Sequence, residues 1–311
     1  MNYTDKIYVA GHRGLVGSAI VRALQKDGFS NLILKSHEEL DLLDSRAVAT
    51  FFSKEKPTCV FLAAAKVGGI HANKADPVGM LFDNLAIQNN VIKSAYESGV
   101  SKLLFLGSTC IYPRLAPQPT PESALLTGEF EETNKSYAIA KVAGIGLCQA
   151  YAKQYGAKFI SVIPANCYGP GDSFDAEKAH VIPMLMRKFH DAKVSGASNV
   201  TSWGSGEPMR EFLYSDDLAS AALFLMEKYD NPEIINIGTG EEIRIKELAE
   251  AIKDVVGFEG EILWDASKPD GAPRRILDVQ KLHALGWKHS VSLTEGLQKT
   301  YEWYRESNPH G

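Results

Sequence analysis

The chain has 311 residues, and its 33 Lys and Arg against 38 Asp and Glu give a formal net charge of −5 at pH 7. Hydrophobic residues make up 45% and charged residues 23%, which is typical of a globular protein and excludes disorder and collagen-like repeats. No block rich in Lys and Arg stands out in the sequence, so we expect neither nucleic acid nor a membrane surface as partner. The apolar runs are far shorter than the roughly 18 residues that a membrane-spanning helix needs.

The first residues and the cysteines predict a cytoplasmic protein. Asp5 and Lys6 stand where a signal peptide needs a continuous apolar stretch. The chain has four cysteines and no C-x-x-C pair: Cys59, Cys110, Cys148 and Cys167. A chain of this size needs no disulfide framework, so we expect these cysteines to be reduced thiols.

Strand and helix patterns alternate through the first half of the chain. Strands are predicted at 6–10, 31–35, 58–62, 102–106 and 158–163. Helices are predicted at 15–26, 45–53 and 78–97. This alternation predicts an α/β fold whose doubly wound parallel sheet is covered by helices on both faces.

The second half is less regular. Four prolines between 113 and 121 predict a long loop over 112–134, placed where a lid over a ligand would lie. After Pro164 we predict a smaller, mainly C-terminal α/β domain, with helices at 181–190, 245–256 and 293–305 and strands at 234–237 and 261–264. The expected boundaries are 1–165 for the first domain, with 207–237 returning to it, and 166–206 together with 238–311 for the second.

A glycine motif follows the first predicted strand and opens the first predicted helix. It comprises Gly11, His12, Arg13, Gly14, Leu15, Val16 and Gly17. Glycines at such a turn let the backbone approach a pyrophosphate, and the helix N-terminus faces the anion. The same spacing occurs in purely structural turns, but its position between strand and helix favours a dinucleotide site in a Rossmann-type domain.

The residues after the second predicted strand indicate which dinucleotide is bound. Lys35, Ser36 and His37 stand where an NAD enzyme would have an acidic residue for the ribose. Lys35 and His37, together with Arg13, offer cationic side chains to the 2′-phosphate of NADP, so the sequence predicts NADP. The alternative, which Glu38 keeps open, is that these cations are solvated surface side chains.

A second motif indicates a reducing centre. Tyr137 and Lys141 are four residues apart on a predicted helix and therefore share one face. The lysine can stabilise the phenolate of a tyrosine whose pKa is ordinarily near 10. Ser108 follows the fourth strand, at the sheet edge where ligands bind, and can hydrogen-bond a reacting carbonyl. Taken alone, a Tyr/Lys pair is more often a surface pair.

Together these residues resemble the extended short-chain dehydrogenase/reductase family, and further motifs resemble its nucleotide-sugar branch. The further motifs are Ala63–Ala65, Asn166–Pro170, His180–Pro183, Trp203–Gly206, Arg210–Asp217, Asn236–Gly240 and Lys268–Gly271. The resemblance implies NADPH as hydride donor, a nucleotide-diphosphate sugar as substrate and a homodimer joined through helices that flank the sheet. Cys110 and Ile111 stand where the family's dehydratases have an acidic pair, which argues against dehydration.

Within this branch the chain resembles the enzymes that epimerise and reduce a GDP-linked 4-keto-6-deoxy sugar. The resemblance makes Cys110 and His180 the acid/base pair, and their ordinary pKa values near 8.5 and 6.5 suit that chemistry. We expect an extended segment to direct Cys110 and Ser108 the same way. The resemblance assigns Ala64, Lys141, Pro164, Ala165, Asn166 and His180 to the cofactor, and Lys188, Trp203, Arg210 and Asp270 to the nucleotide sugar.

Several points stay open at this stage. Cys59 and Cys148 are expected in the core, and a core position for Trp203 is as well supported as a sugar contact. His37 and Lys188 stand where the family commonly has Arg, and Gly171 where it commonly has His. The alternatives are therefore a related substrate, such as a GDP-4-keto heptose, and a non-catalytic NADP-binding regulator. The Tyr137/Lys141 pair argues against the regulator.

Overall fold

The computed structural model describes residues 1–175, 179–268 and 270–307. Its larger unit is built on a six-stranded parallel sheet with the order β10-β5-β4-β3-β1-β2. The strands are β1 (Ile7–Ala10), β2 (Leu32–Ile33), β3 (Cys59–Leu62), β4 (Lys102–Leu106), β5 (Lys158–Pro164) and β10 (Ile235–Ile237). The strand order reverses beside β1, as in doubly wound folds, so the expected α/β class is confirmed.

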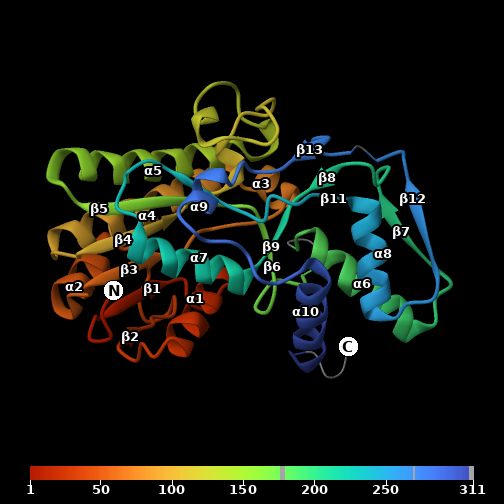
Figure 1. Ribbon diagram of the computed structural model, residues 1–311, viewed down its shortest axis with the longest axis horizontal. Coiled ribbons are helices and arrows are strands. Elements are labelled where there is room, and N and C mark those ends of the chain that lie inside the picture. Colours follow the sequence, from red (N-terminus) through yellow and green to blue (C-terminus); the bar gives the residue numbers. More distant parts are fainter. Residues whose placement is uncertain (176–178, 269, 308–311) are drawn as a thin grey trace.

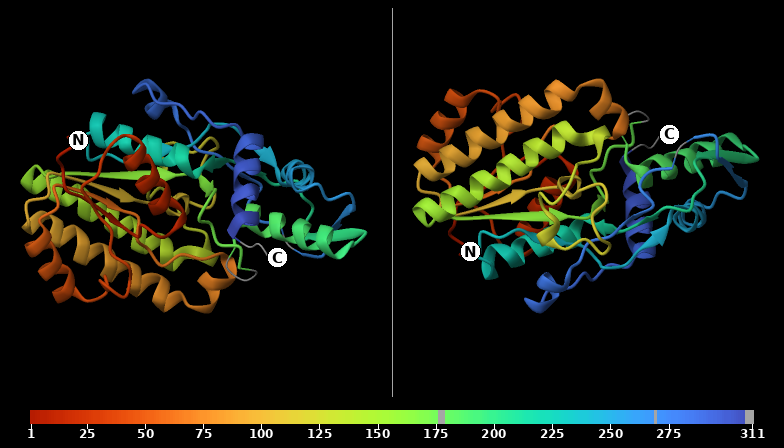
Figure 2. Two further views of the ribbon diagram at one scale, coloured as in Figure 1. Left: turned by 90° about the horizontal axis from the view of Figure 1, so that it is seen from below. Right: turned by 90° about the horizontal axis from the view of Figure 1, so that it is seen from above.

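Helices cover both faces of this sheet (Figures 1 and 2). One face carries α1 (Leu15–Lys26) and α7 (Ser215–Lys228), and the other carries α2 (Ser45–Glu55), α4 (Pro77–Glu97) and α5 (Lys135–Tyr155). Because helices lie on both sides, every residue of β1, β3 and β4 is buried, which explains why these strands are apolar except for Lys102 at the start of β4.

A smaller unit packs beside the larger one (Figure 1). It contains α6 (Val181–Ser195), α8 (Ile245–Val256) and α10 (Leu293–Ser307), which enclose a second apolar cluster around residues such as Phe189, Leu248 and Leu297. Two short sheets complete it: β7 (Asn199–Trp203) with β12 (Glu261–Asp265), and β8 (Met209–Arg210) between β11 (Ile243–Arg244) and β13 (Arg274–Arg275). A short pair of β6 (Asn166–Tyr168) and β9 (Phe212–Tyr214) lies between the two units.

The predicted loop at 112–134 is more ordered than expected. It contains two 3-10 helices, η2 (Glu122–Ala124) and η3 (Glu132–Asn134), and the 3-10 helix η1 (Thr109–Ile111) precedes it. Thr120 forms a bridge with Leu277, and Gln118 Oε1 accepts the backbone N–H of Ile276 at 2.8 Å. These bonds attach the loop to the C-terminal part of the chain.

Two further expectations have a clear outcome. In the described part of the chain, no helix is long and apolar enough to cross a bilayer. All four cysteines are free thiols, and Cys59 and Cys148 are buried in the core as predicted. Residue 269, which belongs to one sequence motif, lies outside the described residues.

Candidate active site

A cavity of about 1210 Å³ lies between the two units, at the carboxyl ends of the parallel strands. It exceeds the ~300–1,000 Å³ of ordinary small-ligand pockets, so it has room for a dinucleotide and a second ligand together. Most of the site residues named from the sequence line it. Four do not: His12, Arg13, Cys110 and Lys188.

The glycine turn has one position that the fold itself does not require to be glycine. Gly11 has φ +83°, and a Cβ on it would lie 2.7 Å from the backbone nitrogen of Ala64. A Cβ on Gly17 would overlap the carbonyl of Gly11. At Gly14, the N-cap of α1, the nearest atom to such a Cβ is 3.6 Å away. Gly14 therefore leaves free space before a helix N-terminus, which is the arrangement that binds a pyrophosphate.

The cations expected at the 2′-phosphate divide into two groups. Lys35 and His37 line the cavity. Arg13 is exposed and forms a 3.6 Å ion pair with the exposed Glu38. Exposed pairs of this kind contribute at most about 1 kcal/mol, so Arg13 can exchange Glu38 for a phosphate at little cost. His12 lies near Arg13, Lys35 and Glu39, and burial and the nearby guanidinium lower its pKa.

The residues expected to form a reducing centre lie near the end of β4, where Lys141 donates to the carbonyl of Leu106. Lys141 is buried, and its Nζ lies 5.7 Å from the centre of the Tyr137 ring and 4.7 Å from that of Phe105. Burial lowers the pKa of Lys141 to about 8 and raises the pKa of Tyr137, so the phenol carries its proton at neutral pH. Ser108 lines the same part of the cavity.

The expected extended segment from Ser108 to Cys110 is wrong. Residues Thr109–Ile111 form η1, because the Ser108 hydroxyl caps this turn by accepting the backbone N–H of Cys110 at 3.4 Å. Cys110 is only 7% exposed, and burial raises the pKa of its thiol to about 11 against the opposing effects of Ser108, Lys141 and Arg275. The thiol is therefore protonated at neutral pH, and it lies close enough to Tyr137 and Lys141 to influence their pKa values.

His180 belongs to the smaller unit. It is the N-cap residue of α6 and lines the cavity. Desolvation there lowers the pKa of its imidazole, so the ring is neutral at pH 7. The two residues proposed for acid/base work thus come from different units, Cys110 from the larger and His180 from the smaller.

The residues of the smaller unit that the sequence assigned to the nucleotide sugar differ in exposure. Trp203 is 72% exposed, so its alternative core position is wrong; the ammonium of Lys268 lies 5.7 Å from its ring centre. Asp270 accepts the backbone N–H and the hydroxyl of Ser205 at 2.9 and 2.6 Å and so fixes the turn after Trp203. Lys188 donates to the carbonyl of Thr201 at 3.4 Å, outside the cavity lining.

Arg275 is a charged neighbour of Arg210 that the sequence did not reveal. It lies opposite Arg210 in the parallel β8–β13 pair, so both guanidinium groups lie on the same face of this sheet. Burial and Arg275 lower the pKa of Arg210, whereas Asp270 raises it. Two-residue strands have no periodicity, and 64 residues separate the partners, so no sequence signal indicates this pairing.

The fold and these residues define a nucleotide-dependent epimerase or reductase. Residues 7–238 match the model of the NAD dependent epimerase/dehydratase family, and the chain belongs to this family.

Curated relatives narrow the class. GDP-L-fucose synthase 1 of Arabidopsis thaliana is 61% identical, covering 96% of this chain and 93% of its own. GDP-L-fucose synthase of Escherichia coli (strain K12) is 51% identical over 97% of both chains.

Solved structures show the same similarity. A GDP-6-OMe-4-keto-L-xylo-heptose reductase from C. jejuni has TM-score 0.94 and 40% identity, covering 99% of both chains. A GDP-L-fucose synthetase from Naegleria fowleri bound to NADP has TM-score 0.92 and 31% identity, covering 100% of this chain and 97% of its own.

Proposed function

We propose that this chain uses NADPH to epimerise and reduce GDP-4-keto-6-deoxy-D-mannose, inverting C3 and C5 before C4 is reduced, to give GDP-L-fucose. The observation that carries the proposal is a single cavity lined by an open helix N-terminus at Gly14, by the Ser108, Tyr137 and Lys141 side chains, and by the His180 imidazole. Relatives 51% and 61% identical over nearly the whole chain bear the name GDP-L-fucose synthase, which supports this substrate.

The cofactor fits the part of the cavity between the glycine turn and the reducing residues. The pyrophosphate would lie at the N-terminus of α1, with His37, Lys35 and Arg13 near the 2′-phosphate. Ala64, Pro164, Ala165 and Asn166 line the cavity toward Tyr137 and would surround the nicotinamide. When bound there, NADPH supplies the hydride for C4.

Epimerisation is assigned to Cys110 and His180. A 4-keto group acidifies the hydrogens on C3 and C5, and each inversion removes a proton from one face and returns one to the other. A neutral imidazole can accept a proton and a protonated thiol can donate one, so the two groups together satisfy this requirement. Arg210, Lys188, Trp203 and Asp270 would hold the nucleotide-diphosphate part of the substrate, and Arg275 adds a second guanidinium beside Arg210.

Reduction is assigned to Tyr137, Lys141 and Ser108. As C4 receives the hydride, its oxygen becomes negative, and the Tyr137 phenol donates the proton that neutralises it. Lys141 stabilises the resulting phenolate, and the Ser108 hydroxyl orients the oxygen through a hydrogen bond.

Three further properties belong to the proposal. We propose domain boundaries at 1–165 with 207–237, and at 166–206 with 238–311. Most members of the two apolar clusters follow this division. The exceptions are Leu277, Val279, Leu282 and Trp287, which pack in the cluster of the larger unit, and Phe212 and Tyr214, which pack in that of the smaller. Exposed apolar side chains on α4 and α5, namely Val78, Phe82 and Ile139, support a homodimer through these helices. Free thiols and an NADPH-dependent reaction support a cytoplasmic location.

The decisive experiment follows isotope exchange. Incubation with GDP-4-keto-6-deoxy-D-mannose in D₂O before NADPH is added should introduce deuterium at C3 and C5, and NADPH oxidation should then follow. Reduction without exchange would contradict the epimerase half of the proposal. Absence of NADPH oxidation with any 4-keto nucleotide sugar would instead favour a non-catalytic regulator.

Two observations favour a second substrate class. The heptose reductase from C. jejuni superimposes with TM-score 0.94, and this chain departs from the family pattern at Lys188 and Gly171. A panel of GDP-linked 4-keto hexoses and heptoses, compared by kcat/KM, distinguishes the two substrates.

A further inference from the structure

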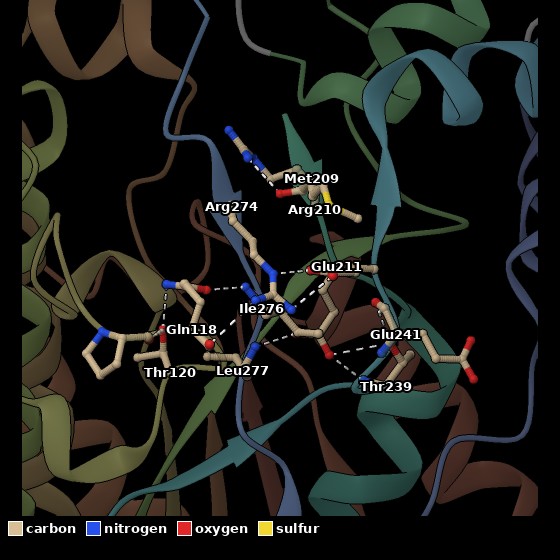
Figure 3. Close-up of polar contacts among 12 residues, drawn as sticks. Gln118, Thr120, Met209, Arg210, Glu211, Thr239, Glu241, Arg274, Ile276 and Leu277 are labelled. Carbon is tan, nitrogen blue, oxygen red and sulfur yellow. Dashed lines mark hydrogen bonds and ion pairs between the residues drawn. The ribbon is translucent and has the colours of Figure 1, made fainter. Parts of the chain in front are cut away.

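The chain crosses between its two units at several places, and three of these crossings meet at one buried residue. Glu211 is itself the crossing between β8 and β9. Residues 238–242 lead from β10 to β11, and residues 276–279 lead from β13 to α9 (Gln280–Ala284). Figure 3 shows Leu277 and Thr239 on opposite sides of the Glu211 side chain.

The carboxylate of Glu211 binds backbone groups of the other two crossings. Its Oε1 accepts the N–H groups of Thr239 at 2.6 Å and Gly240 at 2.8 Å, and its Oε2 accepts the N–H of Leu277 at 2.8 Å. The backbone carbonyl of Glu211 also accepts the side-chain N–H of Asn166 at 3.0 Å. One residue therefore joins four segments of the chain.

The surroundings of Glu211 leave little freedom. Its side chain is 1% exposed, and Gly238 packs so closely that a Cβ there would overlap Oε1. Burial raises the pKa of the carboxyl, and the backbone donors oppose this effect. In the described part of the chain no cation forms an ion pair with Glu211, so its negative charge is balanced by directed N–H groups.

A carboxylate at this position is better suited to fixing geometry than to adding stability. Replacing buried ionic groups by apolar ones of similar volume is often neutral or stabilising, so burial alone gives no reason for a charge here. Hydrogen bonds to a carboxylate are strong and directional, and these bonds fix three crossings at defined positions.

The crossings lead directly to site residues. Arg210 precedes Glu211, and Arg275 is two residues before Leu277. Asn166, bound to the Glu211 carbonyl, lines the cavity beside Ala165. The position of the smaller unit relative to the sheet edge therefore depends on this carboxylate.

We propose that Glu211 is a positioning residue, which fixes the smaller unit with His180 and Arg210 against the larger unit with Ser108, Cys110 and Tyr137. The inference rests on the proposed function, because the reducing residues all belong to the larger unit whereas the epimerising pair is divided between the units. A displacement of the smaller unit therefore impairs epimerisation more than hydride transfer.

The test is Glu211→Gln, which keeps the side-chain length but turns an NH₂ group toward a backbone N–H. Deuterium exchange at C3 and C5 should fall about tenfold more than NADPH oxidation does, as expected when a hydrogen bond to a charged group is lost. The products should include sugar reduced at C4 without inversion at both carbons. The Kd of NADPH should stay within about twofold, because the glycine turn lies entirely in the larger unit.

Two further variants complete the experiment. Glu241→Gln changes an exposed carboxylate in the same turn and should leave exchange and reduction as in the unmodified protein. Gly238→Ala displaces the Glu211 carboxylate without removing it. This variant should likewise lower deuterium exchange more than it lowers NADPH oxidation. If Glu211→Gln does not fold, Gly238→Ala decides the question.

The outcomes are separable. Equal losses of exchange and reduction in the folded Glu211→Gln and Gly238→Ala variants, or no loss in either, would overturn the role of Glu211. Absence of exchange in the unmodified protein would contradict the proposed function instead.

Discussion

The Nζ of Lys141 donates a hydrogen bond to the carbonyl oxygen of Leu106 at 2.8 Å, which fixes the ammonium group at the last residue of β4. Ser108 follows two residues later, and Tyr137 lies one helical turn before Lys141. The end of β4 thus holds the cation and the hydroxyl of the proposed reducing centre, and helix α5 supplies the phenol.

The pH dependence of reduction should follow the Lys141 charge. Because burial lowers the pKa of Lys141 to about 8, the residue loses its charge at a lower pH than an exposed lysine. We expect the rate of NADPH oxidation to fall as pH rises through about 8. Stopped-flow measurement of reduction between pH 6 and 10 tests this; a rate independent of pH up to 10 would show that the charge of Lys141 is not required.

Cys110→Ser should separate the two halves of the reaction. Deuterium exchange should fall by at least about a hundredfold, within the range for loss of an acid/base group. NADPH binding should be unchanged, because Cys110 is not one of the residues that the proposal assigns to the cofactor. Mass spectrometry of the sugar after incubation in D₂O measures the exchange.

The matched control is Cys148→Ala. Cys148 is likewise a buried thiol, but it lies on α5 near Ser161 and is not a neighbour of the Tyr137 and Lys141 charges, as Cys110 is. This variant should lose about 1 kcal/mol of stability and keep its activity per folded molecule. Equal loss of exchange in both variants would mean that Cys110 acts only through packing.

Sequence patterns predicted the larger unit well because its elements are long and locally determined. Apart from Lys102, the residues of the buried strands β1 and β4 are apolar, and α1 and α2 are bounded by residues with a clear local role, such as the Asp44 side chain that caps α2. The boundaries of α1 and β4 agree with the prediction to the residue.

In the smaller unit, the sequence did not predict the elements that depend on contacts between residues far apart in the chain. Strands β8, β11 and β13 have two residues each and are held by partners far away in sequence, so Arg275 could not be placed beside Arg210. The burial of Glu211 could not be predicted from the sequence either. The residues next to it show no burial pattern, and the N–H groups that bind its carboxylate come from two turns that are distant in the sequence. At Cys110 the backbone forms a 3-10 helix instead of the expected extended segment, because the Ser108 hydroxyl caps this helix.

Asp172 should make stability depend on pH near neutrality. Its Oδ1 accepts the N–H of Ser173 at 2.8 Å, its Oδ2 is buried without a partner in the described structure, and burial raises the carboxyl pKa to about 7. Between pH ~4 and 7 the folded protein therefore keeps a proton that the unfolded chain releases. By linkage, stability falls as pH rises through this window, by at most about 4 kcal/mol from this group.

Asp172→Asn removes the titrating group but keeps its shape. Urea unfolding of the variant and the unmodified protein should give a difference in the free energy of unfolding that grows in favour of Asn from pH 5 to pH 8. A difference that does not change with pH would contradict the raised pKa of Asp172.

Gly14 and Gly17 should respond differently to alanine although they belong to one motif. A Cβ on Gly17 overlaps the Gly11 carbonyl, so Gly17→Ala should cost about 1–3 kcal/mol of stability, as overpacking does.

Gly14 has φ −79°, and a Cβ there lies 3.6 Å from its nearest atom, so Gly14→Ala should change stability by less than about 0.5 kcal/mol. The added methyl group nevertheless occupies the space before α1, and the Kd of NADPH should rise about tenfold because the pyrophosphate can no longer approach the helix N-terminus. Urea unfolding and fluorescence titration with NADPH measure the two effects. Unchanged NADPH affinity in Gly14→Ala would mean that the pyrophosphate does not lie at this helix.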